Sequence, residues 1–136
     1  MANTVAAIFS VDKALEQLLT HTEGLRSITV SDRDGVALLK LPEDEAVKEV
    51  DADQVLTTIF SLTTEQTAKL PIIGQTNFIL TTFDECVCLQ ANLLPLVIRL
   101  VADKSMNTGD LIGLLDSIKA VLETTKTAVQ GETDSY

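Results

Sequence analysis

Side chains that commonly catalyse reactions or bind metals are scarce in this chain of 136 residues. It has one histidine, His21, so a Ser-His or Cys-His pair would have to use that residue. His21 falls at the end of an expected helix, where an imidazole faces solvent or interacts with the helix dipole. The two cysteines, Cys86 and Cys88, are two positions apart in an expected strand, so both thiols point to one face of a sheet. Because two thiols and one imidazole are too few for a closed zinc site, we interpret the cysteines as small buried hydrophobic residues and expect neither a metal nor a catalytic site.

The glycine patterns that bind nucleotide phosphates are also missing. The six glycines form neither a GxxxxGKS/T loop nor a GxGxxG fingerprint, so we expect no nucleotide and no other cofactor. Arg99 interrupts an otherwise apolar strand, and two interpretations of it remain open. Either it forms a salt bridge or extends along a sheet face to solvent, or it is supplied in trans to the phosphate of a small GTPase.

The charge balance argues against binding to nucleic acids or anionic lipids. With 20 acidic and 10 basic residues, the formal net charge is −10, which repels phosphate groups. Acidic residues crowd the segment 43–53, in which Lys48 is the one basic residue. This segment is either a solvated loop that leads into a helix or an acidic docking patch for a basic partner.

The length and a composition of 46% hydrophobic and 22% charged residues predict one globular domain. We expect residues 1–10 to be a flexible N-terminal extension, 11–130 the single domain and 131–136 a tail. Val5–Phe9 is too short for a signal-peptide core, and Pro95 and Arg99 interrupt the longest apolar run. A function at a membrane would therefore need another subunit to hold the chain there.

Hydrophobic periodicity predicts three helices and five strands. The first helix starts after Ser10 as N-cap and ends near residue 22, and the last helix starts at Asp110 as N-cap. The second helix is expected at 53–69, and the strands at 25–31, 36–41, 77–83, 86–93 and 96–102. Because three amphipathic helices can cover both faces of a sheet, this order predicts an α+β fold, an α/β/α sandwich on a mainly antiparallel five-stranded sheet.

The turn between the first two strands contains the pair Asp34-Gly35, which takes the positive φ angles of a hairpin turn. Asp32 and Arg33 precede this pair and are expected to be exposed. We therefore predict that replacing both with alanine changes stability little.

Two features predict contact with a second protein. The apolar positions of the helix at 53–69, from Val55 to Leu70, spread over an arc of about 160°, wider than one sheet contact needs. Either this helix is buried deeply in its own domain, or part of the arc meets a partner. The strand at 77–83 starts with Asn77-Phe78-Ile79-Leu80-Thr81-Thr82, which has none of the charges or prolines that protect a free sheet edge, so we expect another chain to cover it.

Three strings resemble one family in the same order along the chain: Val30–Val36 (VSDRDGV), Leu94–Val97 (LPLV) and Asn107–Gly109 (NTG). They resemble the MEK-partner branch of the roadblock/dynein light chain family, over roughly residues 11–125. The resemblance implies a profilin-like roadblock fold, with the second helix on one sheet face and the terminal helices on the other.

The resemblance also implies a function. The implied function is that of a non-catalytic scaffold or adaptor subunit in a Ragulator-like complex, in which the chain pairs with a second roadblock subunit. Such a subunit links MEK–MAP kinase signalling with Rag GTPase and TOR signalling, on the cytoplasmic face of late endosomes or lysosomes, where its partner subunits recruit it. The alternatives are a direct regulator of a small GTPase, in which Arg99 would act, and a dynein-associated light chain, whose strings are less similar.

In roadblock proteins the third strand and the second helix form the dimer interface. Carried over to this sequence, the resemblance implies a partner interface made of Val55, Leu56, Ile59, Phe60, Asn77, Phe78, Ile79, Leu80 and Thr81.

Overall fold

The computed structural model describes the backbone of residues 2–42, 50–93 and 95–134, and its elements follow the expected order. The helices are α1 (Ala2–His21), α2 (Val50–Thr67) and α3 (Thr108–Asp134). The strands are β1 (Leu25–Ser31), β2 (Ala37–Leu41), β3 (Phe78–Thr82), β4 (Cys86–Leu93) and β5 (Leu96–Asp103).

The five strands form one antiparallel sheet in the order β2-β1-β5-β4-β3. Three neighbouring pairs are consecutive in the chain: β1 with β2, β3 with β4, and β4 with β5. The central pair, β1 with β5, joins distant segments, with Thr29 opposite Arg99. Strands β2 and β3 are therefore the two edges of the sheet.

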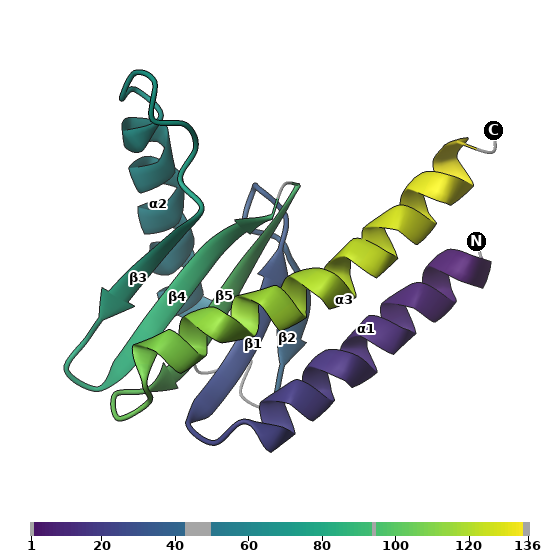
Figure 1. Ribbon diagram of the computed structural model, residues 1–136, viewed down its shortest axis with the longest axis horizontal. Helices are drawn as coiled ribbons and strands as arrows, with labels where there is room; N and C mark the ends of the chain where they lie inside the picture. Colours follow the sequence, from purple (N-terminus) through teal and green to yellow (C-terminus); the bar gives the residue numbers. More distant parts are fainter. Residues whose placement is uncertain (1, 43–49, 94, 135–136) are drawn as a thin grey trace.

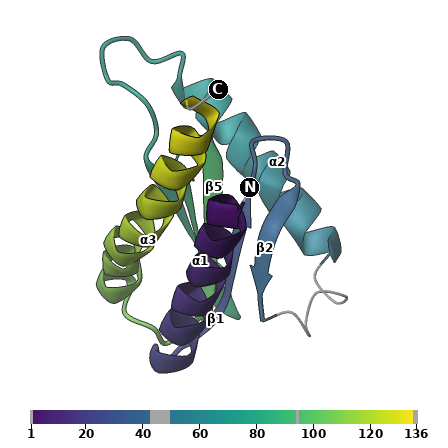
Figure 2. The ribbon, with the colours of Figure 1, turned by 90° about the vertical axis from the view of Figure 1, so that its right-hand side faces the viewer.

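The helices cover both faces of the sheet, as the sequence predicts. Figures 1 and 2 show α1 and α3 side by side on one face and α2 on the other. The main core lies between the sheet and the pair α1/α3, and it is built from aliphatic side chains. Its fully buried members include Leu15 on α1, Ile28 on β1, Ile98 and Leu100 on β5, and Leu111 and Ile118 on α3.

The face of the sheet toward α2 has a different chemistry. Alternation along β4 places Val87, Leu89 and Ala91 in the main core and turns Cys88 and Gln90 toward α2. The buried polar residues of β1 and β5 follow the same alternation and lie on this second face: Ser27, Thr29, Ser31 and Arg99. Helix α2 therefore covers a largely polar sheet surface, which must be satisfied by specific hydrogen bonds.

All three predicted helix starts are wrong, and α2 spans Val50–Thr67 instead of 53–69. Helix α1 begins at Ala2, so Ser10 lies inside the helix, because residues 2–9 contain no glycine or proline that would end it. Helix α3 begins at Thr108, and its N-cap is Asn107, whose Oδ1 accepts a hydrogen bond from the Asp110 backbone N–H at 3.1 Å. The division into an extension, a domain and a tail stays a prediction.

The hairpin turn depends on Asp32 more than the sequence suggested. Oδ1 of Asp32 accepts hydrogen bonds from the backbone N–H groups of Asp34 and Val36, both at 2.9 Å. The prediction that Asp32 is only a surface residue is thus wrong, because a short carboxylate can organise the turn that follows it. The prediction for Asp34 is also wrong, since only Gly35 of the expected pair has a positive φ, of 90°.

Gly35 also lies against α2, which yields a stability prediction. A Cβ built at Gly35 would lie 2.8 Å from Cγ2 of Thr57, whereas a Cβ at Gly74, which also has a positive φ, meets nothing within 4 Å. Gly35→Ala should therefore lower the free energy of unfolding by about 2–3 kcal/mol, and Gly74→Ala by about 1 kcal/mol, in urea denaturation. Adding Thr57→Ser removes the clashing methyl group and should restore part of the loss at Gly35. Equal losses for the two alanine variants would contradict the steric contact.

Candidate partner-binding surface

The outward face of α2 exposes apolar side chains to solvent. Val55, Ile59 and Leu62 are 59%, 40% and 55% exposed, although their spacing is that of one helix face. Phe60 points the opposite way and is buried, and Leu56 is half-buried. Of the two interpretations of the wide apolar arc, deep burial of α2 in its own domain is therefore wrong. An exposed apolar stripe of this kind is typical of an interaction surface.

The free edge of β3 has the same character. This strand pairs only with β4, and its other side has no strand neighbour within the described sheet. Phe78 is exposed, Ile79, Leu80 and Thr81 are half-buried, and Asn77 is exposed just before the strand. Leu80 packs against the main core, so Ile79 points to the opposite face, toward the side on which α2 lies. The edge is apolar and unprotected, as the sequence predicted.

Helix α2 and strand β3 lie toward the same edge of the molecule (Figure 1). A hydrogen bond between the hydroxyls of Thr67, at the end of α2, and Thr76, just before β3, ties the two elements together. The residues predicted for the interface thus come from two elements that can act as one surface. Phe60 faces inward and is the member least available to a partner. Whether a partner touches these residues stays a prediction.

The sequence reasoning missed the loop between α2 and β3. Ile72 is fully exposed and Ile73 is 75% exposed, and both follow Pro71. Ile72 also has a positive φ of 72°, which is unusual for a β-branched residue. The signal available in the sequence is the pair Ile72-Ile73, which follows the helix-ending Pro71 and falls outside every amphipathic pattern.

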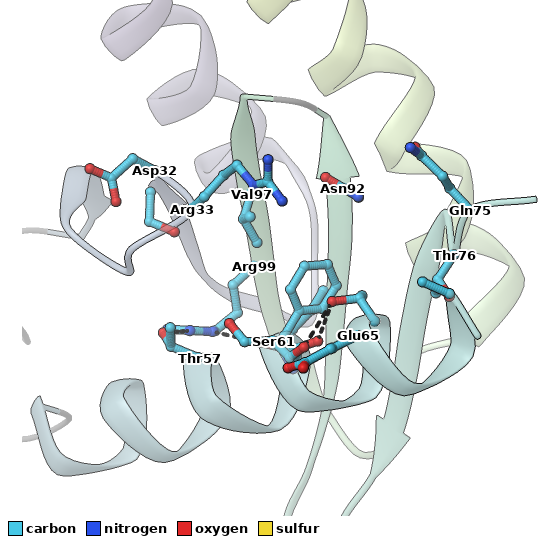
Figure 3. A pocket seen from close by; sticks show the side chains of 15 residues that line it. Asp32, Arg33, Thr57, Ser61, Glu65, Gln75, Thr76, Asn92, Val97 and Arg99 are labelled. Atoms are coloured by element: carbon cyan, nitrogen blue, oxygen red, sulfur yellow. Dashed lines mark hydrogen bonds between the residues drawn. The ribbon is translucent and has the colours of Figure 1, made fainter.

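Polar contacts from Arg99 hold α2 to the sheet (Figure 3). Nη1 of Arg99 donates to Oδ1 of Asp53 at 2.8 Å, and Nη2 donates to Oγ1 of Thr57 at 2.8 Å. Lys40 of β2 forms a second ion pair with Asp53. The Arg99 side chain is only 6% exposed. The salt-bridge interpretation of Arg99 is thus confirmed, and its guanidinium faces α2 within the domain.

Of the remaining candidates for chemistry, His21 lies on the α1 side of the sheet and Cys88 on the α2 side. His21 is exposed in the last turn of α1, where Nδ1 donates to the Gln17 carbonyl at 2.7 Å. Cys88 is buried under α2, as expected, but Cys86 at the start of β4 is only half-buried, so its predicted burial is wrong. The described residues contain no group of three or more potential metal ligands.

Burial raises the pKa of the Cys88 thiol to about 11, from an ordinary value of 9.0. In the unfolded chain the Cys88 thiol ionises near its ordinary pKa of 9.0, whereas the native thiol stays neutral up to about pH 11. Ionisation therefore stabilises the unfolded chain first. The contribution of Cys88 to the free energy of unfolding is complete below pH 9 and is lost as the pH rises from about 9 to about 11. Wild-type protein should therefore lose more stability than Cys88→Ala between pH 8 and pH 11 in urea denaturation. Parallel pH profiles of the two proteins would contradict this prediction.

Several sequence predictions fall outside the described residues. Glu43, Asp44, Glu45 and Glu49 of the acidic segment lie there, as does Leu94 of the LPLV string. Of the acidic segment, only the side chain of Asp53 is described, and it binds Arg99 and Lys40. Among the helices that the structure describes, none has the length and hydropathy of a membrane span.

Comparisons with known proteins agree with this geometry. A family model described as mitogen-activated protein kinase kinase 1 interacting matches residues 9–129. The Ragulator complex protein LAMTOR3-B of Xenopus laevis is 35% identical over 116 residues, which cover 85% of this chain and 93% of that protein. The human Ragulator complex protein LAMTOR3 is 34% identical over 116 residues, covering 85% and 92%. A roadblock/LC7 domain from Streptomyces avermitilis superposes with a TM-score of 0.62 over 90% of this chain and 96% of that domain, at 11% identity, and so shares the fold.

Proposed function

This chain belongs to the mitogen-activated protein kinase kinase 1 interacting family, and we propose on that basis that it is a non-catalytic scaffold subunit of a Ragulator-like complex. The relatives that support this proposal are Ragulator complex proteins that match the chain over most of their own length. The placement of His21 fits a scaffold, because α1 lies on the opposite face of the sheet from Arg99 and Cys88, so the one imidazole shares no site with them.

The observation that carries the proposal is the exposed apolar face of α2 beside the unpaired edge of β3. A second roadblock subunit would place its own edge strand against β3 and its own second helix against α2, which would bury both surfaces at once. A stable interface of this kind buries on the order of 1,600 Å² in total. We therefore propose a heterodimer. Its contact residues on this chain would be Val55, Leu56, Ile59, Phe60, Asn77, Phe78, Ile79, Leu80 and Thr81.

The wider role follows from the family and from the names of the relatives. We propose that the heterodimer binds the other Ragulator subunits, and that it links MEK and MAP kinase with Rag GTPases and TOR signalling. Partner subunits would hold it on the cytoplasmic face of late endosomes or lysosomes. The net charge of −10 supports recruitment through protein partners, since it disfavours direct contact with anionic lipids. Within the chain, residues 11–130 would form the domain that binds these partners, and residues 1–10 and 131–136 would lie outside that domain.

Co-expression with a second roadblock subunit from the same organism tests the proposal. Native mass spectrometry should show a one-to-one heterodimer, and sedimentation velocity should show that it persists on dilution. The chain expressed without the partner should self-associate or aggregate through the same surface. A stable soluble monomer that ignores the co-expressed subunit would contradict both the heterodimer and the scaffold function.

A further inference from the structure

A cleft of about 390 Å³ separates part of α2 from the polar face of the sheet (Figure 3). On one side it is lined by a single face of α2, which continues just past the end of the helix: Thr57, Phe60, Ser61, Thr64, Glu65 and Ala68. Residues of β4 and β5 form the opposite wall, among them Asn92 and Val97. A buried donor in this wall, Nε2 of Gln90, has no hydrogen-bond partner among the described residues, so the contact between α2 and the sheet is incompletely paired. Because a packed interface leaves few voids larger than a water molecule, the volume of the cleft means that the C-terminal half of α2 is not packed tightly against the sheet.

The N-terminal half of α2, in contrast, is anchored to the sheet. Arg99 of β5 donates hydrogen bonds to Asp53 and Thr57. Lys40 of β2 forms an ion pair with the same carboxylate of Asp53. Phe60 follows in the middle of the helix and is the one buried side chain among those of α2 that the structure describes. Because bonds between charged groups are stronger than neutral ones, this end of the helix is the fixed end.

The C-terminal half of α2 is satisfied without the sheet. Oγ1 of Thr64, which lines the cleft, donates a hydrogen bond to the carbonyl of Phe60 in its own helix at 2.9 Å. Thr67 is hydrogen-bonded to Thr76 in the loop before β3, and no described residue of this half bonds to a strand. The loop residues 68–75 are all exposed. Since an element with few buried contacts moves at low cost in free energy, this half of the helix can move against the sheet.

Two charges of opposite sign line the cleft from different walls. Glu65 comes from the C-terminal half of α2, and Arg33 comes from the hairpin turn between β1 and β2 (Figure 3). Neither side chain has an ion-pair partner among the described residues. The carboxylate of Asp32, next to Arg33, accepts two hydrogen bonds within the turn, and Asp34 does not line the cleft. The movable part of the helix thus carries a charge that is attracted toward the hairpin.

We propose that α2 is a hinged helix. It pivots at the Arg99 anchor, and its C-terminal half closes onto the sheet when the partner subunit binds, which brings Glu65 to Arg33. The inference rests on the proposed heterodimer and adds a conformational step to it. The edge strand and second helix of the partner belong to one folded domain, so they can contact β3 and α2 together only if α2 lies as close to its sheet as a packed helix does. The ion pair, removed from water, favours this closed position, and binding and closure then favour each other by the same free energy.

An exchange of the two charges tests the ion pair in the full chain with its co-expressed partner. Arg33→Glu places two carboxylates together in the closed cleft, and Glu65→Arg places two guanidinium groups there. Each should raise the Kd of the heterodimer about tenfold or more in sedimentation velocity. The double variant restores opposite charges and should bring the Kd back to within about threefold of wild type. Asp34→Arg reverses a charge of the same turn outside the cleft and should leave the Kd unchanged.

Electron paramagnetic resonance between two spin labels measures the closure itself, in a chain with Cys86→Ser and Cys88→Ala. One label is attached at Lys69→Cys, next to the C-terminal end of α2, and the other at Ser117→Cys on α3, across the sheet. This distance should shorten when the partner subunit is added. The pair Gln54→Cys and Ser117→Cys reports the anchored end of α2 and should change little. All three labelled positions are exposed, so the labels leave the core intact.

The outcomes separate the hinge from the dimer. A heterodimer that forms without shortening of the distance between positions 69 and 117 would overturn the hinge and leave the proposed function standing. Equal shortening of both pairs would also overturn it, because the helix would then move as a rigid body. A double charge variant that binds no more tightly than the single variants would show that Arg33 and Glu65 do not meet. If no heterodimer forms, the proposed function and the hinge are both wrong.

Discussion

Ile59→Asp should weaken the heterodimer by about 100-fold or more, because it places a charge at the centre of the apolar face of α2. Ile59 is 40% exposed in the single chain, so the substitution leaves the main core intact. Desolvating an unpaired carboxylate at the contact is costly, and the loss should appear mainly as faster dissociation. Sedimentation velocity at a series of concentrations measures the change.

Leu38→Asp provides the matched control for this prediction. Leu38 is also an exposed aliphatic residue, but it lies on β2, the opposite edge of the sheet. Its replacement should leave the dimer unchanged. If Leu38→Asp dissociated the dimer and Ile59→Asp did not, the partner would pair with β2, and the proposed surface would be wrong.

Asp53→Ala should lower the free energy of unfolding by about 3 kcal/mol, the second large effect that we expect. The substitution leaves the buried guanidinium of Arg99 without a carboxylate, while the bonds to Thr57 and to the backbone carbonyl of residue 53 remain. Arg99→Met should cost less, because it removes the buried charge and leaves Asp53, which is more exposed, paired with Lys40. Urea denaturation measures both losses.

Hydrogen exchange shows whether the effect is local to α2. In Asp53→Ala, the backbone amides of α2 should exchange faster while those of β1 and β5 change little, since the main core lies on the other face of the sheet. Arg26→Ala breaks the ion pair between Arg26 and Asp103. Because both side chains are about half exposed, the free energy of unfolding should be almost unchanged. A loss for Asp53→Ala no greater than that for Arg99→Met would contradict the anchoring role of the pair.

The sequence predicted the parts of the fold that depend on local pattern. The residues 86–93 of β4 were predicted to the residue, because a mainly apolar strand-like run is bounded there by Asp84-Glu85 on one side and Pro95 on the other. The unprotected edge at β3 was visible for the same reason, since charge and proline content are properties of a short segment. The helix start at Asp110 was wrong because Asn107 can also serve as an N-cap, and the start at Ser10 was wrong because residues 2–9 contain no glycine or proline that would end the helix.

The sequence by itself determined the order of the elements, their apolar faces and the family, because periodicity and short strings are contained within a few turns or strands. The tertiary structure alone decided which distant residues meet. Arg99 was visible as a charge in an apolar strand, but the pairing of β1 with β5 and the position of α2 bring Asp53 to it. Gln90 was unremarked in the sequence, because a glutamine in a strand becomes significant only when its face is buried and its donor lacks a partner. Hydrogen-bond satisfaction depends on every neighbour in space, and no local pattern encodes those neighbours.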